Sequence, residues 1–168
     1  MRNIRLPPHG AAGGVGLFAV QFAKLKGAYV IGTAGAENIE FIRSLGVDLA
    51  IDYSRTPFEQ LAGMVDFVLD TVGGETLERS FSIVKKGGVL ISIAGRPAPA
   101  KGQQLGIRVL GSSPATRQDL IDIAKLADDG RIRTYVQRVY PLHMASMAHE
   151  RSESGHGRGR IVLNVADA

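Results

Sequence analysis

The sequence predicts an α/β fold, a Rossmann-type doubly wound parallel sheet with helices on both faces. Segments with a strand pattern alternate along the chain with segments of helical spacing, which is typical of such a sheet. Glycines stand at most of the changeovers between them. The 168 residues, 45% of them hydrophobic, can bury the core of one domain but are too few for two full domains.

The alternation is clearest in the first part of the chain. Apolar residues at helical spacing predict a helix over 15–26, which Gly27 should end. Further elements are expected as a strand over 28–33, a helix over 38–45 ended by Gly46, a strand over 49–53 and a short helix over 57–64.

The middle of the chain continues the pattern. We expect a buried strand over 65–70, a helix over 75–84 closed by Lys85–Gly88, strands over 89–93 and 107–110, and a loop over 96–104 between these two strands. A helix should then run to Asp128, capped by Ser113 or Thr116. Asp119 lies three residues after Thr116, as in a capping box.

The character of the sequence changes after Gly130. An extended segment over 131–139, a helix over 143–150 and a strand over 161–165 are expected, with a polar link over 151–160. We therefore divide the chain into residues 1–130 and a tail over 131–168.

The segment HGAAGGVG precedes the first predicted helix. Ala11, Gly13 and Gly16 occupy the three positions of the motif GxGxxG, and Gly10 and Gly14 add backbone freedom. Dinucleotide pyrophosphates bind to backbone N–H groups at such a helix start, where side chains would block the approach. The alternative is a tight turn with a purely structural role, but the surrounding strand, helix and strand favour a cofactor site.

The second predicted strand bears on the choice of cofactor. An NAD site usually has an acidic residue about 20 residues after the first glycine, where it accepts from the ribose hydroxyls. No acidic residue occurs in Ile31–Gly35, which favours NADPH. Candidates to contact its 2′-phosphate are Thr33, Asn38, Arg43 and Tyr53, although Arg43 can equally be a solvated helix residue.

Composition excludes several classes of site. The chain has no cysteine, so disulfides, thiol catalysis and thiolate zinc sites are excluded. The net charge of +4 suits an anionic partner, either a dinucleotide or a nucleic acid. No segment is long and apolar enough to cross a membrane, and we expect a cytoplasmic protein. No metal is expected, because the histidines are not spaced as ligands: His9, His143, His149 and His156.

Two other groups of residues are candidates for a catalytic or a nucleic-acid-binding site. Asp66 and Asp70 fall on one face of a strand and could form an acid and base pair, but aspartates at strand ends more often cap loops. The link over 151–160 contains Arg151, Arg158 and Arg160. It lacks aromatic residues for base stacking, so we expect a solvated loop and no nucleic-acid binding.

Long blocks of the sequence resemble the zinc-independent, quinone oxidoreductase-like family of medium-chain dehydrogenases. They are HGAAGGVGLFAVQFAKLKGAYVIGTA, SLGVDLAIDY, VDFVLDTVGGETLERSF, KKGGVLISIAG and SESGHGRGRIVLNV. The resemblance implies a nucleotide-binding domain that holds NADPH. It also implies hydride transfer to a small-molecule quinone or to an activated C=C bond in an enone.

The resemblance also implies roles for individual residues. Gly14 and Val15 would meet the pyrophosphate, and Arg160 stands where relatives commonly have lysine. Thr33, Asn38 and Tyr53 would meet the adenosine phosphate, although relatives often have lysine near position 38. The remaining positions are Val72 at the adenosine ribose and Ile93, Ala94 and Gly95 at the nicotinamide ribose.

The start of the chain departs from the family pattern. Relatives begin with a catalytic domain, which we expect to be absent here, while 131–168 resembles the tail that returns to that domain. Pro7 and Pro8 replace aliphatic residues of a central strand, and we expect a shortened or displaced first strand. Strong hydrogen-exchange protection across Ile4–Leu6 and His9 would contradict this.

Two functions remain open at this point. The chain is either the cofactor half of a reductase, completed by a homodimer or by a chain that supplies the catalytic domain, or a non-catalytic nucleotide-binding or interaction module.

Overall fold

The computed structural model describes residues 5–6, 8–155 and 157–166. The strands are β1 (Arg5–Leu6), β2 (Pro8–His9), β3 (Tyr29–Ala34), β4 (Leu49–Asp52), β5 (Val65–Asp70), β6 (Val84–Ser92), β7 (Arg108–Leu110), β8 (Val136–Pro141) and β9 (Arg160–Asn164). The α-helices are α1 (Gly16–Leu25), α2 (Ile39–Ser44), α3 (Phe58–Ala62), α4 (Gly74–Ser80), α5 (Pro99–Leu105), α6 (Arg117–Asp128) and α7 (Ala145–Glu153). Three short 3₁₀ turns cover Ala36–Asn38, Phe81–Ile83 and Leu142–Met144.

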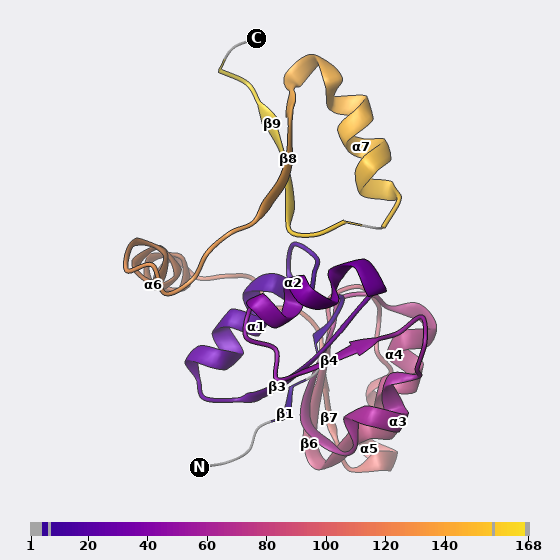
Figure 1. The fold of residues 1–168 in the computed structure, drawn as a ribbon. Helices are drawn as coiled ribbons and strands as arrows, with labels where there is room; N and C mark the ends of the chain where they lie inside the picture. Colours follow the sequence, from indigo (N-terminus) through magenta and orange to yellow (C-terminus); the bar gives the residue numbers. More distant parts are fainter. Residues whose placement is uncertain (1–4, 7, 156, 167–168) are drawn as a thin grey trace.

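The first seven strands form two parallel hydrogen-bonded sheets, β1-β3-β4 and β2-β5-β6-β7, which meet at the central strand and together are wound in two directions from it (Figure 1). On one side of the first strand lie β3 and then β4, and on the other side lie β5, β6 and β7. One core lies beneath α3 and α4 and includes Val68 and Leu90. A second core, beneath α1 and α2, includes Val20 and Val30. The predicted doubly wound α/β fold, with helices on both faces, is confirmed.

The central strand is divided into two short pieces. Arg5 and Leu6 of β1 pair with β3, whereas Pro8 and His9 of β2 pair with β5. This division agrees with the predicted shortening of the first strand, because a proline cannot donate to a ladder. Pro7 itself lies outside the described residues.

The predicted loop over 96–104 is wrong from Pro99 onward, where α5 begins. Pro99 occupies the first turn of this helix, where a missing N–H costs nothing, and Gly106 ends the helix with a φ of 67°. Gly102 packs closely on β7, since an added Cβ would lie 2.3 Å from the side chain of Val109. The helix is thus defined by its two ends and by packing, which the weak periodicity of the segment did not reveal.

The predicted end of the helix at Lys85–Gly88 is also wrong. The helix α4 ends at Ser80, and Lys85–Gly88 belong to β6, where the register with β5 is irregular. Lys85 extends to Asp66 on the neighbouring strand, with Nζ 2.9 Å from the carboxylate. Contacts between strands therefore override a local pattern that is typical of a helix end.

The predicted capping of α6 is confirmed at Thr116. The Thr116 hydroxyl accepts a hydrogen bond from the Asp119 amide at 3.2 Å, and the Asp119 carboxylate accepts one from the Thr116 amide at 2.8 Å. The Thr116 hydroxyl also donates to this carboxylate, at 2.7 Å, and the bonds from the Thr116 amide and hydroxyl lower the pKa of Asp119. Both partners of the expected capping box are present.

The strands β8 and β9 form a separate parallel pair, with α7 between them in the sequence (Figure 1). This lobe meets the body at the glycine turn, where Gly13 and Gly159 form an isolated bridge. The strand β9 lies within one residue of its predicted bounds, whereas β8 begins five residues later than predicted, at Val136, and α7 runs three residues further than expected, to Glu153. In the part of the chain that the structure describes, none of the helices has the length and apolar character that crossing a membrane requires.

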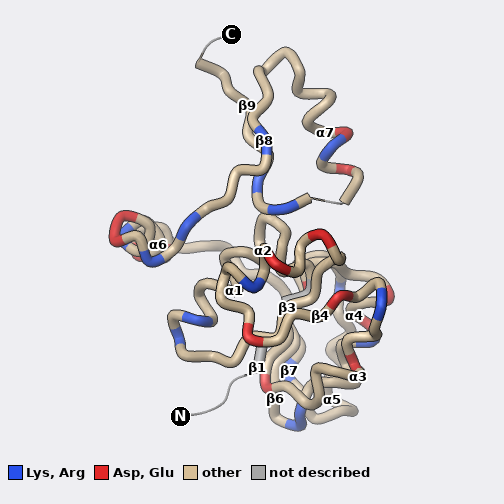
Figure 2. Tube along the Cα trace, viewed as in Figure 1, with Lys and Arg blue, Asp and Glu red and all other residues tan. Residues whose placement is uncertain are grey.

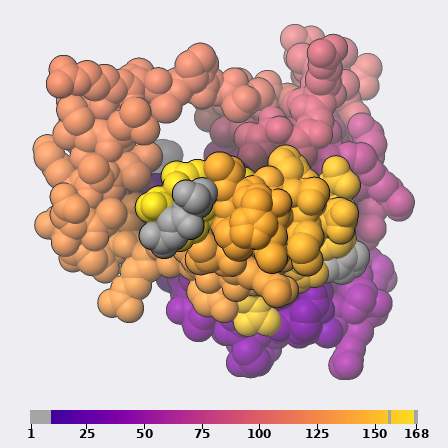
Figure 3. Space-filling view, turned by 90° about the horizontal axis from the view of Figure 1, so that it is seen from above, coloured from indigo at the N-terminus to yellow at the C-terminus, as the bar shows by residue number. Residues whose placement is uncertain are grey.

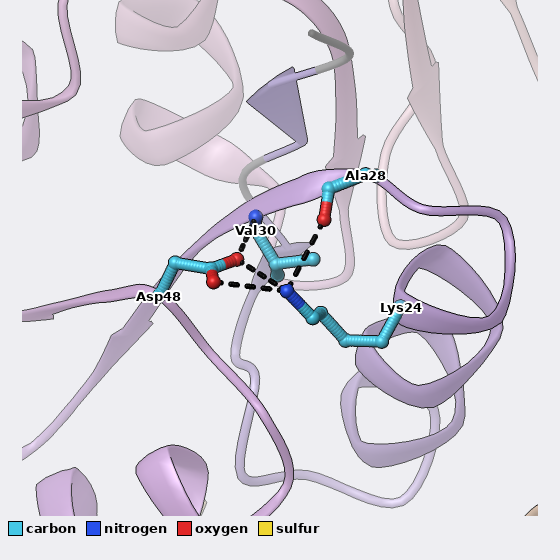
Figure 4. Close-up of polar contacts among 4 residues, drawn as sticks. All are labelled: Lys24, Ala28, Val30 and Asp48. Carbon is cyan, nitrogen blue, oxygen red and sulfur yellow. Dashed lines mark hydrogen bonds and ion pairs between the residues drawn. The ribbon is translucent and has the colours of Figure 1, made fainter. Parts of the chain in front are cut away.

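An ion pair beneath α1 makes stability depend on pH (Figure 4). The Asp48 carboxylate accepts from Lys24 Nζ at 2.8 Å and from the Val30 amide at 2.7 Å. Burial raises the pKa of Asp48, but these hydrogen bonds outweigh burial and hold its pKa below the ordinary value. A lowered pKa gives stability that is present above the ordinary carboxyl pKa and is lost as pH falls through the lowered one.

Replacing Asp48 with asparagine should therefore cost up to about 1 kcal/mol of unfolding free energy at pH 7, the upper range for a partly exposed pair. The difference from wild type should shrink as the solution is acidified below the ordinary carboxyl pKa, because the wild-type side chain then also becomes neutral. Urea unfolding at several pH values measures it. A difference that stays constant across this range would contradict the assignment.

Candidate functional site

The glycine turn lies at the carboxyl edge of the sheet, between β2 and α1. The Gly13 amide donates to the carbonyl of Gly10 at 2.9 Å, and the Ala11 amide donates to the carbonyl of Thr33 on β3 at 3.1 Å. A Cβ added to Gly16 would lie 2.1 Å from the carbonyl oxygen of Gly10. Gly16 is thus required for the turn to pack against the start of the helix, as expected for the third position of the motif.

The start of α1 carries a cationic side chain from the other end of the chain. The Gly159 amide donates to the Ala12 carbonyl at 2.7 Å and brings the next residue, Arg160, over the turn. The Arg160 guanidinium lies 5.9 Å from the ring centre of Phe18 and about 3 Å from where a Cβ on Gly14 would be. Helix amides, backbone without side chains and a guanidinium together form a site suited to a pyrophosphate.

Three cavities follow the turn and share lining residues. Their volumes are about 380, 190 and 350 Å³. The first two share Gly10, Tyr53 and Val72, the last two share Gly13, and Gly155 borders all three. These adjoining cavities, together called the channel, lie over the carboxyl edge, the usual place for a ligand in an open α/β sheet.

The end of the channel near β3 has an acidic residue in its lining and a cationic residue beside it. Glu37 lines the 190 Å³ cavity, and its carboxylate accepts a hydrogen bond from the side-chain amide of Asn38 (Nδ2) at 3.0 Å. Arg158 donates to the backbone carbonyl of Glu37 at 3.1 Å, and its guanidinium lies 5.5 Å from the ring centre of Phe41. Figure 2 shows basic residues at the base of the β8–β9 lobe, where it faces this end of the body.

A buried carboxylate organises the loops after β5 and β6. Asp70 is fully buried and accepts hydrogen bonds from the Val72 amide at 3.1 Å, the Gly73 amide at 2.9 Å and the Ser92 hydroxyl at 2.7 Å. The Ser92 hydroxyl in turn accepts from the Gly95 amide at 3.0 Å. This chain of bonds positions Val72 at the channel and holds the end of β6 beside it.

The structure separates the predicted site residues into groups. Seven of them line the channel: Gly13, Gly14, Thr33, Asn38, Tyr53, Val72 and Arg160. Ala11 is fully buried and Gly16 packs on the turn, so both shape the site from beneath. Ile93, Ala94 and Gly95 follow β6 and do not line these three cavities.

Two predicted site residues do not line the channel. Val15 precedes α1, but its side chain borders an apolar groove on the other flank of that helix. Arg43 forms an ion pair with Glu40 on the exposed surface of α2 and does not line the channel. The solvated-helix interpretation of Arg43 is therefore the one that agrees with the structure.

Sequence reasoning missed several residues of the channel. Glu37 lies two residues beyond Ile31–Gly35, the range in which an NAD site usually has its acidic residue, so a slightly wider range would include it. Arg158 was expected in a solvated loop, but it also contacts the body, through the Glu37 carbonyl and the ring of Phe41. Gly155 and Gly157 line the channel from the same segment. These contacts join residues more than a hundred positions apart, so local patterns could not show them.

The other candidate groups do not form sites. Asp66 pairs with Lys85, whereas Asp70 binds loop amides, so the two carboxylates have different partners and no acid and base pair is formed. Among residues 5–6, 8–155 and 157–166, no cluster of three or more His, Cys, Asp or Glu could hold a metal ion. Zinc independence stays a prediction.

Comparison with known proteins adds two kinds of finding. The family model described as zinc-binding dehydrogenase matches residues 45–163. The structure superposes on a quinone oxidoreductase from Coxiella burnetii with a TM-score of 0.90 and 33% sequence identity. The match covers 96% of this chain and 53% of that protein.

Curated relatives give the same picture. A probable mitochondrial zinc-binding oxidoreductase of Arthroderma benhamiae is 34% identical over 98% of this chain and 53% of its own length. The human mitochondrial NAD(P)H oxidoreductase RTN4IP1 is 34% identical over 93% of this chain and 46% of its own length. The chain thus spans about half the length of the curated relatives it matches.

Proposed function

The chain belongs to the zinc-binding dehydrogenase family and contains the NAD(P)-binding domain of a medium-chain oxidoreductase, and from this premise we propose that it binds NADPH for a quinone oxidoreductase-like reductase. The observation that carries the proposal is the glycine turn at the start of α1, with Arg160 held over it. Gly14 and Arg160 would hold the pyrophosphate. Thr33, Tyr53 and Val72 would enclose the adenosine.

The reduced nicotinamide would supply a hydride to a quinone or to the activated C=C bond of an enone. Residues of this chain would bind and orient the cofactor, with Val72, Ile93, Ala94 and Gly95 held by the bonds that centre on Asp70. The residues that contact the substrate would come from the half of the family's fold that this chain does not span. We propose that 131–168 packs against that half.

The choice of NADPH depends on Arg158, because its guanidinium lies beside the backbone of Glu37 at the adenosine end. A guanidinium binds phosphate oxygens, whereas the Glu37 carboxylate favours ribose hydroxyls. Replacing Arg158 with glutamine should weaken NADPH about tenfold or more and leave NADH almost unchanged, since a charge-assisted hydrogen bond contributes about 1.5 to 3 kcal/mol.

Fluorescence titration with both cofactors measures this effect, and Arg43→Gln, which lies outside the channel, is the matched control. Equal losses of affinity for NADPH and NADH in the Arg158 variant would contradict a 2′-phosphate contact.

The alternative is a non-catalytic nucleotide-binding or interaction module, which is favoured by the division of the central strand into β1 and β2. Oxidation of NADPH in the presence of a simple quinone or enone separates the two functions. Turnover supports the reductase, and binding without turnover, even with the other half of the fold present, supports the module. The compartment stays a prediction: the sequence favours the cytoplasm, whereas two relatives are named as mitochondrial.

A further inference from the structure

The β8–β9 lobe contacts α2 through two aromatic rings. Viewed from above, the orange and yellow atoms of the lobe lie over the violet atoms of the body (Figure 3). The ring of Phe41 on α2 meets the ring of Tyr135, just before β8, with ring centres 4.8 Å apart and planes tilted by 55°. Phe41 is half-buried and packs against the core beneath α1 and α2. It is therefore a supported ring that also faces the lobe.

The side chain of Arg158 lies over the same ring. Its guanidinium carbon is 5.5 Å from the centre of Phe41, within the distance of about 6 Å at which a cation is attracted to an aromatic face. The guanidinium also donates to the Glu37 carbonyl at 3.1 Å, and the Arg158 amide donates to Oε1 of Gln137 at 3.2 Å. A guanidinium carries five N–H donors, so others can reach an anion at the adenosine end of the channel.

The ring supplies something that the hydrogen bond to Glu37 cannot. A long arginine side chain has many rotamers, and a single bond to a carbonyl leaves the guanidinium free to turn about that bond. Stacking on an aromatic face restricts this turning, because the guanidinium is planar. The Arg158 guanidinium is thus ordered before a ligand arrives, which lowers the entropy lost on binding.

We propose that Phe41 is a positioning residue: its ring holds the Arg158 guanidinium beside Glu37 and thereby sets the preference for NADPH over NADH. Phe41 is not among the described residues that line the channel, so it acts through another residue. The inference rests on the proposed function in taking Arg158 as the contact of the 2′-phosphate. It goes further in assigning the cofactor preference to an aromatic ring that the cofactor does not touch.

A second route leads from Phe41 to Arg160. The carbonyl of Tyr135 accepts a hydrogen bond from the Arg160 amide at 2.8 Å, so a shift of Tyr135 would also reach the pyrophosphate site. The pyrophosphate is common to both cofactors. Any effect along this route therefore changes the affinities for NADPH and NADH together, whereas an effect through Arg158 changes only the affinity for NADPH. Comparing the two cofactors separates the routes.

The test replaces Phe41 with leucine, which removes the ring, and with tyrosine, which keeps it. Fluorescence titration of the full chain measures the affinities for NADPH and NADH. Phe41→Leu should weaken NADPH relative to NADH about threefold or more, as expected for the loss of an exposed cation–π contact. Phe41→Tyr should keep the wild-type ratio. Phe22→Leu, the same change at another half-buried phenylalanine, on α1, is the matched control.

A double variant tests whether Phe41 acts through Arg158. Phe41→Leu combined with Arg158→Gln should show the same ratio of the two affinities as Arg158→Gln alone, because the ring has no guanidinium left to hold. Where Arg158→Gln does change this ratio, the proposal is overturned by an unchanged ratio in Phe41→Leu or by a further fall in the double variant. Circular dichroism checks that each variant is folded.

A measurement without cofactor keeps the inference separate from the proposed function. The Nε–H signal of Arg158 in an NMR spectrum, assigned by its loss in Arg158→Gln, should be shifted by the ring current of Phe41. It should move in Phe41→Leu and stay close to its place in Phe41→Tyr. A signal that does not move in Phe41→Leu overturns the positioning role. A signal that moves, while Arg158→Gln weakens both cofactors equally, contradicts the 2′-phosphate contact and leaves the positioning of Arg158 supported.

Discussion

Replacing Gly16 with alanine is expected to remove detectable cofactor binding and to lower the free energy of unfolding by about 3 kcal/mol, the upper range for overpacking. The added Cβ would lie 2.1 Å from the Gly10 carbonyl oxygen and 2.7 Å from the Ala11 Cα. Both contacts are with backbone, so no side-chain rotation relieves them. The turn must move away from α1, and the amides that would bind the pyrophosphate move with it.

Urea unfolding and cofactor titration of the same Gly16 variant measure the two effects. Gly111→Ala is the matched control, because a Cβ there meets nothing within 4 Å and the backbone has no positive φ. A Gly16 variant that binds NADPH with wild-type affinity would show that close packing of the turn is not needed.

Replacing Asp70 with alanine is expected to destabilise the protein by about 3 to 5 kcal/mol, because each buried donor left without an acceptor costs about 1 to 3 kcal/mol. The Val72 and Gly73 amides and the Ser92 hydroxyl all lose their acceptor. The loops that carry Val72 and Gly95 should loosen, so cofactor affinity should fall in the fraction that stays folded.

Asp66→Ala tests the same strand as a control and should cost less than about 1 kcal/mol, since its pair with Lys85 is partly exposed. Asp70→Asn keeps one acceptor oxygen and should fall between the two. Denaturant midpoints order the three variants. Equal costs at positions 66 and 70 would contradict a structural role for the buried carboxylate.

Local patterns in the sequence predicted the fold and the centre of the site well. The spacing of Gly13 and Gly16 before a helical pattern located the turn, and Thr116 with Asp119 located the start of α6. Such features depend on residues a few positions apart. The helix α5 was missed because its definition comes from its end residues and from packing of Gly102 on β7.

Long-range contacts account for most of what the sequence did not show. Arg158 and Arg160 look like part of a polar linker, yet the bridge between Gly13 and Gly159 brings them to the start of α1. The role of Asp70 likewise depends on Ser92 from the neighbouring strand. Neither contact leaves a periodic signal in the sequence, because each is defined by how strands and lobe meet in space.

The most direct test of the account is the thermal stability of the chain titrated with NADPH and, separately, with NADH. A ligand that binds only the folded state at 100 times its dissociation constant adds about 2.7 kcal/mol of stability. We predict a rise in melting temperature that grows with NADPH concentration and is larger with NADPH than with NADH. No shift with either cofactor would contradict the claim that the glycine turn and Arg160 form a dinucleotide site.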